Sequence, residues 1–331
     1  MQRRLELTGE HALADGLGHA LGAMMQEAEA QARAAVEDPA SALHEYRRAI
    51  RRAQAVVALT APMLRKRQRK QLAVELRRAT RRTRTLRDLD AVMPVLGKLE
   101  SNETDAVGAA ELAALRAYLE AAATEIAGSE ITAWRLRKNV RAIAGLGAIF
   151  RAGLHGWVED DMLLDSLRDH YKVVRNAWKA AVASDASDDL HAWRRAARTL
   201  RYQLELLASR PGASPGLVAL RETFEDQVKQ LGQVTDLLAL AGLVRTADPE
   251  LLGTDPDALV ERLRAIAAAR SALVMSEAEA VFAVKPKSFA WPVEAEAASA
   301  SAELAHAASP ASSEAAKPTE GAAASGQPAA S

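Results

Sequence analysis

Hydrophobic residues recur at alternating intervals of three and four along most of the chain, which is the pattern of amphipathic α-helices. The strict apolar–polar alternation that is typical of a half-buried strand does not occur. Proline and glycine interrupt the pattern at Pro39, Pro62, Gly128, Pro211 and Pro249, where helices should begin or end. We therefore predict an all-α protein. The expected helices span residues 12–37, 40–61, 65–98, 104–127, 131–151, 159–184, 187–208, 216–246 and 256–283.

The helical pattern stops near Pro286. Five of the chain's twelve prolines lie beyond residue 285, among alanine, serine and glutamate. A segment of this composition buries too little apolar surface to order itself. We predict a disordered tail over residues 290–331.

Two of the predicted helices carry the same motif 147 residues apart, at residues 43–52 and 190–199. One histidine and three arginines recur at relative positions 0, 3, 4 and 7. At about 100° per residue these positions share one side of a helix, opposite an apolar side. The two stripes are His44, Arg47, Arg48 and Arg51, and His191, Arg194, Arg195 and Arg198. The repeat predicts a helical domain over residues 10–285, with related halves at about 10–152 and 158–285.

The charges of the chain are balanced in number but uneven in position. There are 43 Lys and Arg against 43 Asp and Glu, so the formal net charge is zero, yet residues 44–90 hold fifteen basic and four acidic side chains. Within this segment Glu45 is the only acid before Glu75, and no acid lies between Asp189 and Glu205. Like charges at i,i+3 and i,i+4 repel one another, so this arrangement favours an anion site over a solvated surface with i,i+4 ion pairs.

A third basic stripe lies on the helix predicted over residues 65–98. Its members are Lys66, Lys70, Arg77, Arg81 and Arg84. The stripe leads to Asp88 and Asp90, and Asp236 occupies a similar place in the second half. These carboxylates could bind a metal, but beside arginines the commoner role is an ion pair. We expect no bound metal and no cofactor.

Several classes of protein are excluded. The chain has no cysteine, which excludes disulfide scaffolds, iron–sulfur clusters and thiol catalysis. It has no uncharged apolar run long enough for a transmembrane helix. The first ten residues lack the apolar run of a secretory leader. These features predict a cytoplasmic protein.

The ordered motifs resemble those of the CHAD family, the conserved histidine α-helical domain. They are Leu43-His44-x-x-Arg47-x-x-x-Arg51-Arg52, Leu86-Arg87-Asp88-Leu89-Asp90, Tyr171-x-x-x-Arg175, Leu190-His191-x-x-Arg194-Arg195-x-x-Arg198-x-x-Arg201-Tyr202-x-x-Glu205, and Leu231-Gly232 with Asp236. The resemblance spans about residues 10–285. It implies two pseudo-twofold-related four-helix bundles that face each other across a basic channel, which binds inorganic polyphosphate.

The resemblance and the basic stripes together give the candidate polyphosphate-binding residues. These are His44, Arg47, Arg48, Arg51, Arg52, Lys66, Lys70, Arg77, Arg81, Arg84, Tyr171, Arg175, His191, Arg194, Arg195, Arg198, Arg201 and Tyr202. Some family members also carry a triphosphate-tunnel hydrolase domain with an N-terminal Glu-x-Glu-x-Lys motif. This chain has Leu5-Glu6-Leu7 there, so we do not expect that activity.

We therefore expect a non-catalytic polyphosphate-binding protein, and the resemblance also connects it with polyphosphate granules. Other interpretations remain open. His44 or His191 could act with Asp88, Asp90 and Asp236 in a metal-dependent phosphohydrolase, or could instead hold the two halves together. The helices or the tail could coat a storage granule as an adaptor. Nucleic acid is a weaker candidate partner, because stacking aromatic residues do not interleave with the arginines.

Overall fold

The computed structural model describes residues 13–37, 39–83, 92–100, 107–127, 130–155, 159–184, 186–209, 213–247, 249–252 and 254–288. The helices are α1 (Leu13–Glu37), α2 (Pro39–Leu59), α3 (Lys66–Arg82), α5 (Ala109–Ala127), α6 (Glu130–Ile143), α7 (Leu146–Gly153), α8 (Asp160–Ala183), α9 (Ser187–Ala208), α10 (Pro215–Val244), α11 (Pro249–Leu252) and α12 (Pro256–Ala283). Residues 92–100 form a further helix. The described ranges contain no strand, only an isolated bridge between Leu64 and Leu154. The protein is therefore all-α. The predictions for Arg84, Asp88, Asp90 and the tail concern residues outside the described ranges.

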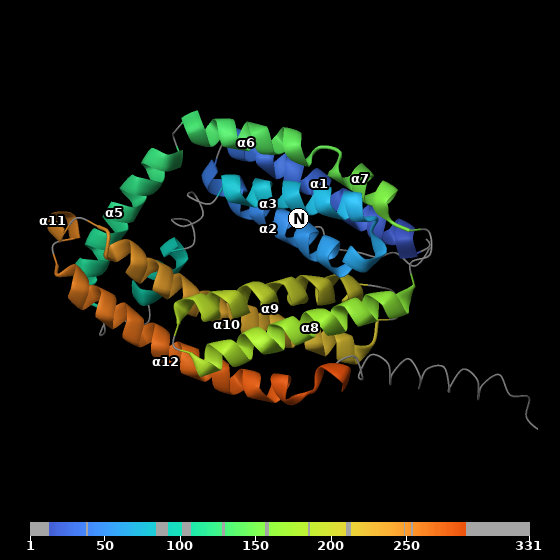
Figure 1. Cartoon of the computed structure of the whole chain (residues 1–331). Coiled ribbons are helices and arrows are strands. Elements are labelled where there is room, and N and C mark those ends of the chain that lie inside the picture. The colour runs from blue at the N-terminus through green and yellow to red at the C-terminus, as the bar shows by residue number, and fades with distance from the viewer. Residues whose placement is uncertain are drawn as a thin grey trace, which may run out of the picture.

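The helices form two bundles that face each other (Figure 1). In the first bundle α1 packs on α2, α6 and α7, and α3 packs on α2, α6 and α7. In the second bundle α9 packs between α8 and α10, and α10 packs on α12. Helix α5 crosses from the first bundle toward α11 and α12 (Figure 1). None of the described helices is long and apolar enough to span a membrane.

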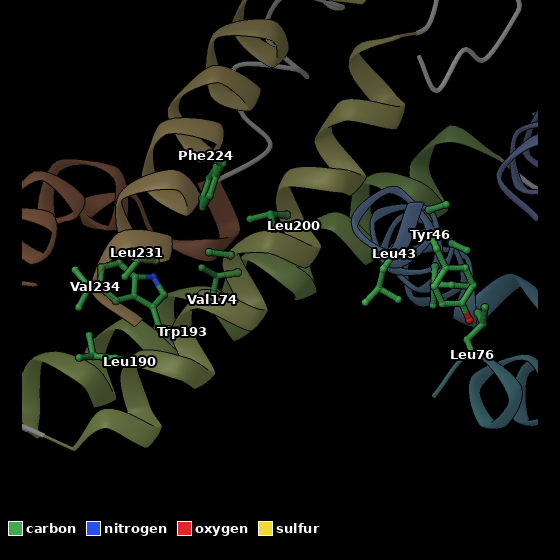
Figure 2. Close-up of a cluster of buried hydrophobic side chains, with 14 of the residues drawn as sticks. Leu43, Tyr46, Leu76, Val174, Leu190, Trp193, Leu200, Phe224, Leu231 and Val234 are labelled. Carbon is green, nitrogen blue, oxygen red and sulfur yellow. The ribbon is translucent and has the colours of Figure 1, made fainter. Parts of the chain in front are cut away.

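The apolar sides of the repeated helices form the cores, as their spacing predicts. Leu43 and Tyr46 of α2 are buried in the first bundle together with Leu76 of α3. Trp193 of α9 is fully buried in the second, where Figure 2 shows it beside Leu231. The opposite, basic sides of α2 and α9 are therefore left for other contacts.

Aromatic residues concentrate in the second bundle, around Phe282 near the end of α12. The rings of Trp178, Trp193, Tyr171 and Phe224 have centroids 5.1, 6.3, 6.0 and 6.2 Å from that of Phe282. Tilted and edge-on contacts of this kind add to the energy gained by burial. The cluster joins α12 to α8, α9 and α10.

The helix predicted over residues 131–151 is wrong as one element, because α6 ends at Ile143 and α7 begins at Leu146. Gly145 between them has φ +80°, a left-handed conformation that favours glycine. A Cβ on Gly147 would lie 3.1 Å from Cα of Gly22, so glycine lets α7 approach α1 closely. The predicted helix 65–98 is also too long: α3 ends at Arg82, with Thr83 as its C-cap.

The two bundles meet where the C-terminal halves of α2 and α9 touch. Arg52 Nη2 of α2 lies 2.6 Å from Glu205 Oε1 of α9, and both side chains are largely buried. Gln203 Nε2 donates a hydrogen bond of 3.2 Å to the carbonyl oxygen of Ala55. These contacts join the bundles at one end of α2 and α9.

Candidate anion-binding site

The N-terminal halves of α2 and α9 border a pocket of about 280 Å³. Helix 92–100 and α10 complete its wall. The lining residues are His44, Arg47 and Arg51 of α2, Pro94, Val95 and Lys98 of helix 92–100, Arg194 and Arg198 of α9, and Val228, Lys229, Gly232, Gln233 and Asp236 of α10. We call this cavity the basic pocket. It brings both repeated stripes to one site.

Positive charge dominates the basic pocket. Of the described residues, six lysines and arginines line it, from α2, helix 92–100, α9 and α10, together with one histidine and one carboxylate, Asp236. Walls of one sign focus the electrostatic field in a cavity and attract ions of the opposite sign. The pocket is therefore suited to an anion of several charges.

Arg47 and Arg194 are held in equivalent ways at the base of the two stripes. Arg47 Nη1 donates to the carbonyl oxygen of Thr83 at 2.5 Å and to Thr83 Oγ1 at 2.8 Å. Arg194 Nη1 donates to Thr235 Oγ1 and, at 2.6 Å, to Asp236 Oδ1. In both halves a threonine of the next helix thus orients the arginine.

Gly232 leaves room for the guanidinium of Arg194. A Cβ at this position would lie 3.2 Å from Arg194 Nη2, closer than most real Cβ contacts, so the guanidinium would have to shift slightly. This close approach explains a glycine in the middle of α10, where glycine otherwise weakens a helix. The Leu231-Gly232 motif is thereby connected to the pocket.

Several candidate arginines pair with acids, so the expectation of unpaired stripes is wrong for Arg48 and Arg194. Arg52 and Arg201, which lie outside the two stripes, are paired as well. Arg201 Nη2 lies 3.3 Å from Glu205, which also binds Arg52. Arg201 Nη1 lies 3.1 Å from Glu225 of α10, and Arg48 lies 3.6 Å from Glu45. Most of these carboxylates come from another helix, and only the fold brings them close.

Three other candidates support the core instead of lining the pocket. The hydroxyl of the buried Tyr171 donates to the carbonyl oxygens of Val281 and Val284, at 2.8 and 2.9 Å, and burial raises its pKa to about 12. Arg175 Nε donates to the carbonyl oxygen of Phe282 at 2.7 Å. Tyr202 is buried under Arg201, whose guanidinium carbon lies 4.6 Å from the ring centroid.

The remaining candidates lie at or near the surface. His44 is exposed at the pocket, while Arg195 is exposed and His191 half-buried outside its lining. The α3 stripe is exposed and does not line the pocket; its described members are Lys66, Lys70, Arg77 and Arg81. Five of the candidates therefore meet in the pocket: His44, Arg47, Arg51, Arg194 and Arg198.

Two lysines of the pocket, Lys98 and Lys229, were not among the residues predicted from the sequence. Lys229 precedes Gln233 and Asp236 by four and seven residues, which places it on the same side of α10 and was a usable signal. Lys98 carried no such signal, because only the fold brings helix 92–100 to α2.

The carboxylates of the described residues do not form a metal centre. No group of three or more histidine and acidic side chains within these ranges could hold a metal ion. The pocket's Asp236 binds Arg194 through both oxygens, at 2.6 and 3.3 Å. Its position is that of an ion-pair partner, whereas Asp88 and Asp90 lie outside the described residues.

Comparisons with known proteins agree with this fold. The family model described as CHAD domain matches residues 17–245. The crystal structure of the CHAD domain from the plant Ricinus communis is similar over 88% of this chain and 95% of that chain, with a TM-score of 0.55 and 19% sequence identity. A likeness at this identity concerns the fold alone. No curated protein matches the chain.

Proposed function

Because the chain belongs to the CHAD domain family, we propose that it binds inorganic polyphosphate in the basic pocket between its two bundles. One observation carries this proposal: among the residues that the structure describes, six lysines and arginines from four helices converge on one cavity with a single carboxylate. A linear chain of phosphates presents repeated charge and acceptor oxygens, which match such a lining.

The arginines are the main ligands in this proposal. A guanidinium donates two parallel hydrogen bonds to one phosphoryl group and keeps its charge at every physiological pH. Arg51 of α2 and Arg198 of α9 lie at equivalent positions of the repeat and both line the pocket. Arg47 and Arg194, already oriented by threonines, supply further positive charge with little loss of side-chain freedom.

Binding is non-catalytic in this proposal. Phosphoanhydride hydrolysis needs a general base or a metal-held water close to phosphorus. Among the described residues, Asp236 is the only carboxylate that lines the basic pocket, and it is engaged by Arg194. Retention of intact polyphosphate would also allow association with polyphosphate granules in a cell.

Salt dependence of binding tests the proposal. If polyphosphate releases counterions on binding, log affinity should fall linearly with log salt, with a slope of about −0.7 per neutralised phosphate charge and about −4 for six contacts. Arg198→Ala should weaken binding about tenfold and flatten the slope by about 0.7. The matched control is Arg264→Ala on α12, whose side chain is 49% exposed and pairs with Glu261.

Two results would contradict the proposal. A slope near zero, or equal effects of Arg198→Ala and Arg264→Ala, would mean that the basic pocket does not bind the polyanion. Sustained release of phosphate from polyphosphate, with or without magnesium, would contradict the non-catalytic role.

A further inference from the structure

We propose that a long polyphosphate chain leaves the basic pocket on one side only, along the exposed flank of α3, and not along the equivalent flank of α10. This inference rests on the proposed function. It gives the bound chain a direction and adds a second contact surface that only a long phosphate chain can reach. We call this surface the α3 track. The track consists of Lys66, Lys70, Arg77 and Arg81.

Three other cations of α3 differ from the α3 track by their contacts, whereas Arg67 is exposed like the track. Arg69, Arg78 and Arg82 bind the Ala61 carbonyl, Glu75 and Asn139, respectively. No acidic side chain among the described residues forms an ion pair with any member of the track. The four side chains are exposed on the helix surface, so their charge is available to a ligand in solution.

The contacts of α3 place the track beside α2. Gln54 of α2 donates to the carbonyl oxygen of Leu76 at 3.1 Å and to Thr80 Oγ1 at 3.0 Å, which identifies the side of α3 that faces α2. Asn139 of α6 donates to the carbonyl oxygen of Ala79, which identifies the side that faces α6. At about 100° per residue, the track lies next to the α2 side and away from the α6 side.

The C-terminal end of α3 lies next to a residue of the basic pocket. Arg47 lines the pocket and binds Thr83, the residue that caps α3. From Arg81 back to Lys66 the helix extends about 22 Å, at 1.5 Å per residue. A chain that leaves the pocket past Thr83 therefore reaches the four exposed cations of the α3 track.

The second half lacks a matching track. Thr83 and Thr235 each bind the equivalent arginine, so α3 and α10 can be compared at an offset of 152 residues. The positions equivalent to the four residues of the α3 track are Val218, Glu222, Lys229 and Gln233. Their formal charges cancel, whereas the α3 track carries four positive charges.

Acidic residues further neutralise this side of α10. Glu222 lies 2.8 Å from Arg221, and Glu225 lies 3.1 Å from Arg201 and 3.8 Å from Arg221. A phosphate chain that followed α10 would meet these carboxylates. The two halves share a fold, but their charges leave only the α3 side open to a polyanion.

The test compares two variants of the full chain that lose the same charge. The track variant is Lys70→Gln, Arg77→Gln, Arg81→Gln, and the control variant is Lys172→Gln, Lys179→Gln, Lys287→Gln, at exposed positions of α8 and beyond α12. Affinity for tripolyphosphate and for long-chain polyphosphate is measured by calorimetry over a range of salt. All six side chains are exposed, so both variants should fold.

We expect the track variant to bind long-chain polyphosphate about tenfold more weakly, with a salt slope flatter by about 2 units, because three exposed contacts are removed. Its affinity for tripolyphosphate should stay close to that of the wild type, and the control should match the wild type for both ligands. Equal behaviour of the two variants, or an equal loss for both ligands, would overturn the track and leave the pocket intact. If the wild type bound neither ligand, both the track and the proposed function would be wrong.

Discussion

At the scale of single residues, the two halves use arginine in two ways. A guanidinium has five N–H donors in a fixed plane, so it can bind a protein acceptor and still present donors to a ligand. Arg194 combines both uses, because it lines the basic pocket and binds Thr235 and Asp236. Arg52 instead faces Glu205 with 7% of its side chain exposed, which suits a structural ion pair.

Glu205 is the residue whose loss should most weaken the contact between the bundles. Its carboxylate binds Arg52 and Arg201, whose side chains are 7% and 14% exposed. Glu205→Gln should lower the free energy of unfolding by about 2–3 kcal/mol, because two largely buried guanidiniums lose their counter-charge. Chemical denaturation followed by circular dichroism measures this change.

The control is Glu225→Gln. This residue also pairs with Arg201, but its side chain is 48% exposed, so the change should stay within about 0.5 kcal/mol. Similar losses for the two variants would show that the Arg52 contact does not stabilise the junction.

His170 of α8 should make folding sensitive to acid. Burial lowers its pKa below the ordinary value of 6.5, and a hydrogen bond to the Ala58 backbone and the charge of Asp169 offset only part of this effect. The folded chain then binds this proton less tightly than the unfolded chain, so the free energy of unfolding decreases as the pH falls through 6.5 toward the folded pKa.

Removal of the imidazole should remove this contribution. In His170→Gln the slope of unfolding free energy against pH should be smaller by at most about 1.4 kcal/mol per pH unit between pH 7 and 5. His19→Gln, at an exposed position of α1, serves as the control for the loss of an imidazole. An unchanged slope in His170→Gln would assign the acid sensitivity to other groups.

At the scale of helices, local sequence predicted where most helices lie. It did not predict where a continuous helical pattern is broken into two helices. The apolar spacing of α9 and the Asp255-Pro256 start of α12 are local signals, and both helices begin and end where the sequence predicts. The break at Gly145 was not predicted, because a lone glycine is tolerated within a helical pattern. Its left-handed conformation depends on how α7 packs on α1, which no local pattern encodes.

Two glycine substitutions should have opposite effects on stability. Gly145→Ala places a Cβ on a residue with φ +80° and should cost about 1–2 kcal/mol. Gly242 lies within α10 with open space around its Cβ position, so Gly242→Ala should stabilise the fold by about 0.5–1 kcal/mol. Thermal unfolding of both variants measures the difference. Destabilisation by both would mean that space or rigidity at Gly242 is also required.

The candidate site was predictable only in part, because the contacts of its residues depend on how neighbouring helices pack. The stripe around Arg47 and the stripe around Arg194 are local patterns, so sequence placed each of them on one side of its helix. Whether a stripe residue meets a carboxylate depends on the neighbouring helix. Arg201 therefore looked like a ligand in sequence, whereas Glu225 of α10 reaches it in the structure.

At the scale of the whole molecule, the two copies of the repeat line one pocket, and the helices beside that pocket differ in charge between the two halves. The bundles touch at the C-terminal halves of α2 and α9, and the N-terminal halves of the same helices border the basic pocket. Equivalent residues of the repeat, such as Arg51 and Arg198, therefore line one cavity. A short polyanion should contact both halves together.

Binding stoichiometry tests this shared site. One tripolyphosphate should bind per chain, and Arg51→Ala and Arg198→Ala should each weaken that single event about tenfold without changing its stoichiometry, because each removes one charge-assisted contact from the same ligand. Isothermal titration calorimetry gives both quantities. Two independent sites would instead give two tripolyphosphates per chain, with each substitution removing one and leaving the other at wild-type affinity. In that case the pseudo-twofold repeat would be a pair of separate sites and not two walls of one pocket.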